Sequence, residues 1–84
     1  MISDAMRTRI NEQINRELYS AYLYLSLSAH AERVNLKGTA AWFMAKHAEE
    51  MAHALKMYRY LLDQDAAVEL GAVAAPPVGP DGVM

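Results

Sequence analysis

Residues 10–31 read INEQINRELYSAYLYLSLSAHA, and this stretch decides the fold. One set of its residues recurs at steps of four and three positions: Ile10, Ile14, Glu17, Ala21, Tyr24, Ser28 and Ala31. That spacing places the set on one face of an α-helix. The stretch holds no glycine or proline that would interrupt a helix. The pattern therefore predicts a long helix over about residues 4–34, with Ser3 as its N-cap.

A second stretch repeats the pattern through Phe43, His47, Glu50, Ala54, Met57 and Leu61. It predicts a helix over about residues 36–65, with Asn35 as its N-cap. Gly38 then lies in the first turn, where it would allow close packing. Alternatively, Gly38 ends the first helix, which moves the boundary by about three residues. Because the connection is short, we expect an all-α, antiparallel two-helix hairpin.

Composition excludes several classes of protein. The chain has 84 residues, no cysteine, 54% hydrophobic residues and a net charge of −2. The absence of cysteine rules out disulfides and thiolate metal sites. The slightly negative net charge offers no basic surface that would bind nucleic acid. The uncharged run over residues 18–29 is shorter than the roughly 20 residues of a membrane span. The N-terminus lacks the apolar core of a signal peptide, so we expect a cytoplasmic protein without a membrane partner.

The first helix is apolar nearly all round over residues 18–27, and a single neighbouring helix cannot cover every face. We therefore expect the hairpin, residues 1–65, to dimerise into a four-helix bundle and to form a larger homo-oligomer. Residues 66–84 are expected to be an extended or disordered tail. Within that tail, residues 68–73 would lie along a partner and residues 76–84 would be loose.

Two acids interrupt the apolar seams. Glu17 is central in the first seam, Glu50 is central in the second, and His53 shares the face of Glu50. A carboxylate in an apolar core is costly unless a cation compensates it. Neither seam contains Lys or Arg between positions 14–28 or 47–61. The simplest supplier of the missing charge is a metal ion.

The number of ligands indicates how such a site is completed. One hairpin offers two carboxylates and one imidazole, too few for two metal ions. Two hairpins related by a two-fold axis offer four carboxylates and two imidazoles, which balance two divalent cations. A Glu from two helices and a Glu-x-x-His from two others is the donor set of di-iron carboxylate bundles. Mixed oxygen and nitrogen ligands suit iron or manganese, whereas zinc would bind without exchanging electrons.

Four stretches, in this order, resemble the first half of a prokaryotic non-haem ferritin. Residues 11–24 match helix A, and residues 35–38 with 42–43 match the turn and the start of helix B. Residues 47–54 match the iron motif of helix B, and residues 72–77 match the start of the following loop. The resemblance covers roughly residues 5–77. It implies a ferritin-like four-helix bundle.

The resemblance also implies a role for each site residue. Glu17 would be a terminal ligand of one iron, Glu50 would bridge two irons, and His53 would be the terminal nitrogen ligand. Tyr24 would lie beside the di-iron centre and hydrogen-bond a carboxylate or donate an electron. Glu49 would contribute to an additional, weaker iron site on the way out.

The implied activity is that of a ferroxidase, which oxidises Fe²⁺ to Fe³⁺ with O₂ or H₂O₂ for iron storage or detoxification. A ferritin chain continues through helices C and D, which supply the rest of the site. The sequence here stops in the loop after helix B, so we expect a second chain to complete the centre in a symmetric homodimer. Encapsulated ferritins, which are two-helix chains, are similar in that respect.

Other interpretations remain open. The chain is alternatively a non-catalytic helical association module, or a truncated ferritin half that docks on a full-length subunit. A di-iron redox protein with another substrate, such as a peroxide-scavenging relative, is a third possibility. Glu49 is alternatively a solvated acid beside Lys46 or Lys56.

Some single residues also allow two interpretations. Glu17 is alternatively a surface acid paired with Arg16 or Arg9. Gln13, one turn before Glu17, is better interpreted as a helix-surface amide than as a residue that hydrogen-bonds around the site. His47 is better interpreted as a histidine satisfied within the core than as a ligand. Met51 is better interpreted as packing than as a haem ligand.

Overall fold

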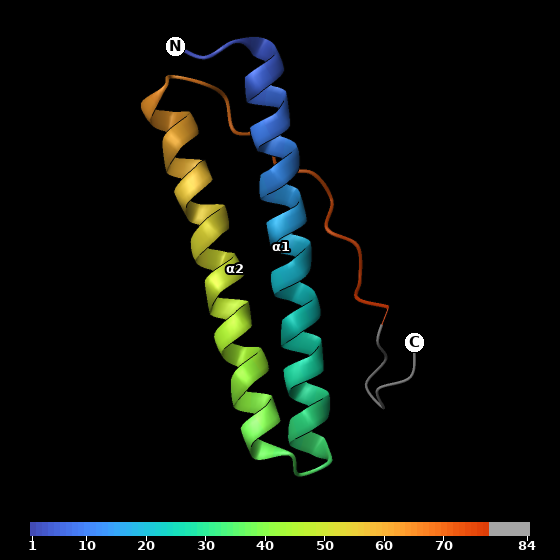
Figure 1. Cartoon of the computed structure of the whole chain (residues 1–84). Helices are drawn as coiled ribbons and strands as arrows, with labels where there is room; N and C mark the ends of the chain where they lie inside the picture. The colour runs from blue at the N-terminus through green and yellow to red at the C-terminus, as the bar shows by residue number, and fades with distance from the viewer. Residues whose placement is uncertain (78–84) are drawn as a thin grey trace.

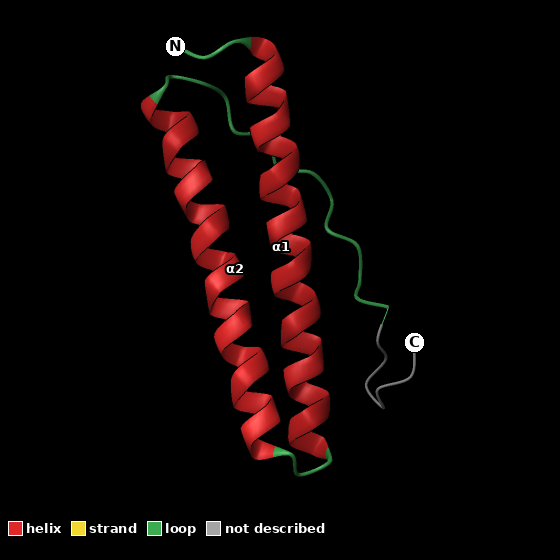
Figure 2. Ribbon diagram, viewed as in Figure 1, coloured by secondary structure: helices red, strands yellow, loops and turns green. Residues whose placement is uncertain are grey.

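The computed structural model describes residues 1–77 of the chain. Helix α1 (Asp4–Arg33) and helix α2 (Lys37–Asp63) run antiparallel, side by side, over their whole length (Figure 1). The described residues contain no strand, and the remaining segments are loops (Figure 2). The predicted all-α antiparallel hairpin is confirmed.

Helix α1 begins as predicted. The backbone N–H of Met6 donates a 3.1 Å hydrogen bond to Oγ of Ser3, whose backbone is extended. This bond satisfies one of the N–H groups that lack a partner inside the helix. Asp4 lies in the first turn and Arg33 in the last, so both charges complement the helix dipole.

The prediction for Asn35 is wrong, because this residue ends α1 instead of capping α2. Asn35 has a φ of 62°, in the left-handed region. Its N–H donates to the carbonyl of Glu32 at 3.1 Å, and the N–H of Leu36 donates to that of Ala31 at 2.8 Å. This pair of bonds defines a Schellman motif, in which Asn is one of the few residues that replace glycine. Leu36 takes the N-cap position of α2 without a side-chain hydrogen bond.

Gly38 lies in the first turn of α2 as expected, but not for the reason expected. It is the second residue of α2, and a Cβ built there meets no atom within 4 Å. Close packing therefore does not explain the glycine. Helix α2 ends two residues earlier than expected because Asp65 also adopts a left-handed φ, of 57°. The N–H of Ala66 donates to the carbonyl of Leu61 at 2.9 Å and closes a second Schellman motif.

The two predicted seams meet at the helix interface. Buried residues common to the prediction and the structure are Ile14, Ala21, Ser28, Ala31, Ala54 and Leu61. Small side chains bring the helices close near the turn, where the hydroxyl of Ser28 donates a 2.8 Å hydrogen bond to the carbonyl of Ala40. At the other end, Ile14 and Leu61 form the main apolar cluster.

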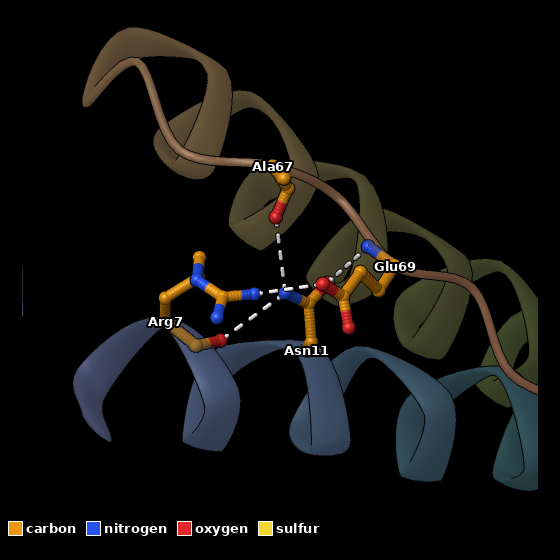
Figure 3. Close-up of polar contacts among 4 residues, drawn as sticks. All are labelled: Arg7, Asn11, Ala67 and Glu69. Carbon is orange, nitrogen blue, oxygen red and sulfur yellow. Dashed lines mark hydrogen bonds and ion pairs between the residues drawn. The ribbon is translucent and has the colours of Figure 1, made fainter. Parts of the chain in front are cut away.

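Residues 66–77 form neither helix nor strand, and they cross α1 (Figure 1). Ala66 and Val68 pack against the apolar cluster, and the Asn11 side chain holds the backbone of Ala67 and Glu69 (Figure 3). The stretch expected to lie along a partner therefore lies on its own chain. The part of the tail predicted to be loose lies, from residue 78 onward, outside the described residues.

Large apolar side chains remain exposed on both helices. They include Tyr22, Leu25, Trp42, Met44, Leu55, Tyr58, Tyr60 and Leu62. One helix neighbour thus leaves much apolar surface in water, as expected from the sequence. Neither helix of the described chain is long and apolar enough to cross a membrane.

Candidate metal centre

Glu17, Glu50 and His53 meet near the middle of the hairpin. Glu50 and His53 share a face of α2 because they are three residues apart. The antiparallel arrangement brings Glu17 of α1 opposite them. One ligand atom from each residue lies within 4.8 Å of the other two. Nδ1 of His53 is 3.7 Å from Oε2 of Glu17 and 3.9 Å from Oε1 of Glu50.

The two carboxylates are largely withdrawn from water. The Glu17 side chain is 17% exposed and that of Glu50 is 20% exposed, whereas the His53 side chain is 59% exposed. Within residues 1–77, neither carboxylate forms an ion pair with a Lys or Arg. Two half-buried acids facing one imidazole therefore lack a permanent cation. Carboxylate oxygens and an imidazole nitrogen suit Fe²⁺, Mn²⁺ or Zn²⁺, so the donor set fits the metal that the sequence implies.

A hydrogen-bonded chain of side chains on α1 reaches the site from outside. Nε2 of Gln13 donates a 2.9 Å hydrogen bond to Oε1 of Glu17, and Nη1 of Arg16 donates a 2.9 Å hydrogen bond to Oε1 of Gln13. Arg16 also lies 3.7 Å from the carboxylate of Glu12. Arg16 therefore contacts Gln13 and Glu12. Within residues 1–77, neither Arg16 nor Arg9 pairs with Glu17, although the surface interpretation required such a pair.

Two other predicted site residues lie outside this group. The Tyr24 ring is half-buried, with its centroid 6.2 Å from that of Phe43. Within residues 1–77, its hydroxyl makes no hydrogen bond to Glu17 or Glu50. Glu49 is exposed, and its carboxylate lies 3.2 Å from Nζ of Lys46. Glu49 is therefore not one of the three converging ligands in the described chain, and Tyr24 is not joined to their carboxylates by a hydrogen bond.

The neighbouring His47 and Met51 have packing roles in the structure. Nδ1 of His47 lies 2.8 Å from the carbonyl of Ala21, which can only accept, so Nδ1 carries the hydrogen. Met51 lines an apolar hollow between the helices and the tail, opposite Leu18 and Val73. This agrees with the preferred interpretations of both residues.

The ferritin-like domain model matches residues 7–83 of the chain. The chain belongs to the ferritin-like family. Over 79 residues it is 37% identical to a bacterial non-heme ferritin of Bacteroides fragilis, covering 94% of this chain and 50% of that one. Over 76 residues it is 42% identical to a bacterial non-heme ferritin of Campylobacter jejuni, covering 90% of this chain and 46% of that one. The resemblance seen in the sequence is confirmed.

The hairpin also superimposes on solved ferritins. An open pore ferritin from the archaeon Archaeoglobus fulgidus matches it with a TM-score of 0.88 and 42% identity, covering 92% of this chain and 48% of that one. The Chlorobium tepidum ferritin matches with a TM-score of 0.85 and 38% identity, covering 90% and 46%. The chain spans about half the length of the curated relatives it matches.

Proposed function

We propose that this ferritin-like chain binds Fe²⁺ as a substrate through Glu17, Glu50 and His53 and promotes its oxidation to Fe³⁺, for iron storage or detoxification. The observation that carries the proposal is the convergence of these three side chains, within 4.8 Å, in a hairpin that gives their carboxylates no Lys or Arg partner. A divalent cation supplies the charge that the carboxylates need.

A second copy of the chain completes the site. Three ligand residues cannot complete the coordination of two ions, but a two-fold axis beside His53 doubles the set to four carboxylates and two imidazoles. Trp42 and Tyr60 lie three and two helical turns from His53, so they share its face of α2, and both are exposed. Packing two hairpins through this face buries both aromatic side chains and places the two ligand groups together in a four-helix bundle.

The redox chemistry balances with iron as the electron donor. Two Fe²⁺ ions lose one electron each, and O₂ takes up both electrons with two protons to give H₂O₂. With H₂O₂ as the oxidant, the same two electrons and two protons give two molecules of water. The protein holds the two ions side by side, so that both electrons leave together. Its carboxylates favour the higher charge of Fe³⁺, and the exposed His53 edge leaves room for exchange.

The remaining assignments follow the family resemblance. Glu50 is the ligand shared by the two ions, whereas Glu17 and His53 are terminal ligands. Tyr24 lies two turns from Glu17 along α1, from where it serves as an electron donor. Glu49 lies outside the ligand group and binds Fe³⁺ transiently as the ion leaves the site. The ion then competes with Lys46 for the Glu49 carboxylate.

Iron loading combined with measurement of mass in solution tests the proposal. We expect one tightly bound Fe²⁺ per chain under anaerobic conditions, a mass of at least two chains, and rapid oxidation once O₂ is admitted. Glu50→Ala should abolish the tight binding and the rapid phase. Glu32→Ala, which removes an exposed acid at the far end of α1, should leave both intact. A monomer, or a Glu50→Ala variant that oxidises Fe²⁺ normally, would overturn the proposal.

The exposed apolar side chains also favour a second candidate function, a non-catalytic association module that docks on another helical protein. In that case the purified chain would associate but retain far less than one metal ion per chain after anaerobic loading. The two functions therefore differ in metal content, not in oligomeric state.

A further inference from the structure

Gln13 hydrogen-bonds one of the two carboxylate oxygens of Glu17. It lies one turn before Glu17 on α1, and its Nε2 donates a 2.9 Å hydrogen bond to Oε1 of that carboxylate. The other oxygen, Oε2, is the one that faces Nδ1 of His53, at 3.7 Å. The two oxygens of Glu17 therefore have different partners, one a side-chain amide and the other the ligand group.

Arg16 fixes the orientation of the Gln13 amide. Its Nη1 lies 2.9 Å from Oε1 of Gln13, and a guanidinium can only donate hydrogen bonds. The atom of Gln13 that faces Arg16 must therefore be the carbonyl oxygen, which leaves the NH₂ group toward Glu17. Glu12, 3.7 Å from Nη2 of Arg16, holds the guanidinium from its other side.

The partner of Glu17 carries no charge, and this has a consequence for cation binding. A Lys or Arg in the place of Gln13 would orient the carboxylate equally well, but it would neutralise the charge that attracts a cation. A neutral amide restricts the rotation of the carboxylate and leaves its negative charge available. The Arg16 guanidinium donates to Gln13 and not to Glu17, so its positive charge does not pair directly with the carboxylate.

We propose that Gln13 is a positioning residue that occupies Oε1 of Glu17, leaving Oε2 as its single metal-binding oxygen, and that Arg16 acts only through Gln13. This inference rests on the proposed metal site and adds residues outside the ligand set. Groups that hydrogen-bond a metal ligand usually matter for affinity, and their loss commonly weakens metal binding by about 10- to 100-fold.

Titration of the metal-free chain with Co²⁺, followed by calorimetry and by the visible absorption of the bound ion, tests the inference. Gln13→Met keeps the length of the side chain and removes the donor. We expect the dissociation constant for Co²⁺ to rise about 10- to 100-fold and the absorption spectrum to change as Glu17 becomes free to bind through both oxygens. The midpoint of thermal unfolding of the metal-free protein should change little, because the bond joins two residues of one helix and does not link α1 to α2.

Arg16→Met provides the second test. It should weaken Co²⁺ binding less than Gln13→Met does, since the amide remains but loses its fixed orientation. Adding Arg16→Met to Gln13→Met should have no further effect, because Arg16 acts through the residue already removed. Additive losses in the double variant would contradict this order. Gln64→Met, which changes an amide at the far end of α2 in the same way, serves as the control.

The failure of this inference differs from the failure of the proposed function. If the unaltered chain binds no Co²⁺, both are overturned. If the unaltered chain binds Co²⁺ and Gln13→Met binds it equally well with the same spectrum, only the positioning role is wrong. An equal loss of affinity in Gln64→Met would also overturn it, because the effect would then be unrelated to Glu17.

Discussion

Asn11 and Glu69 lie 58 positions apart in the chain, yet the backbone N–H of Glu69 donates a 2.8 Å hydrogen bond to Oδ1 of Asn11. The same side chain donates through Nδ2 to the carbonyl of Ala67 at 3.1 Å (Figure 3). The Asn11 amide thus both donates to and accepts from the tail backbone, as the backbone of a paired β-strand does. An ion pair of 2.9 Å between Arg7 and Glu69 lies beside it. The Asn11 amide is the buried polar link between the tail and α1, beside the more exposed contacts of Arg7 and Asn15.

Removing this amide should release the tail. Asn11→Leu leaves the carbonyl of Ala67 and the N–H of Glu69 without their partner, so we expect a loss of about 1–3 kcal/mol in the free energy of unfolding. Hydrogen exchange should accelerate at residues 66–73. Asn15→Ala, which removes one exposed bond to Ala72, is the control and should cost less. Equal losses in both variants would contradict a special role for Asn11.

The site acids should lower the stability of the metal-free protein. Glu50 is a half-buried carboxylate without a Lys or Arg partner in the described chain, so Glu50→Ala should raise the free energy of unfolding by about 1 kcal/mol at neutral pH. The same change should remove tight Fe²⁺ binding. Chemical denaturation with and without metal measures both effects. A variant that is less stable without metal would show that Glu50 already has adequate partners.

Two adjacent leucines provide a matched test of the core. The Leu61 side chain is fully buried and belongs to the main apolar cluster, whereas Leu62 is 52% exposed. Leu61→Ala should cost about 2–5 kcal/mol in the free energy of unfolding, through lost burial and the cavity left behind. Leu62→Ala should cost roughly 0.5 kcal/mol or less in dilute solution. Denaturation curves that shift equally for both variants would contradict the packing described above.

Two substitutions near the turn between the helices should change the stability in opposite directions. Asn35→Ala should destabilise the protein by about 1 kcal/mol, because alanine resists the left-handed backbone conformation found there. Gly38→Ala should stabilise it by about 0.5 kcal/mol, since a Cβ at this helical position meets open space. Thermal unfolding of the two variants checks the signs. Stabilisation by Asn35→Ala would mean that the turn is not closed by this residue.

The periodic pattern was enough to predict the hairpin and its interface, because helices repeat the same geometry along their length. Ile14 and Leu61 are buried where the seams placed them. The turn was harder to predict, since Asn suits both a helix start and a left-handed helix end, and only the backbone angle at Asn35 distinguishes them. The docking of the tail on Asn11 joins distant positions and leaves no periodic signal.

The candidate site was predictable to a similar extent. The positions of Glu17, Glu50 and His53 follow from helical spacing and an antiparallel turn, and the structure brings them together. The bond from Gln13 depends on side-chain rotamers and on Arg16, which spacing alone does not determine. Spacing of four residues between Gln13 and Glu17 was the only signal for it.

The His53 side chain is exposed in the single hairpin, so the proposed metal centre is completed only when two hairpins meet. When each ion needs donors from two chains, occupancy of the centre varies with the concentration of the polypeptide as well as with that of iron. Dilution then releases iron, and a chelator separates the two chains. Such a molecule would respond to its own abundance, capturing metal only after enough copies have accumulated.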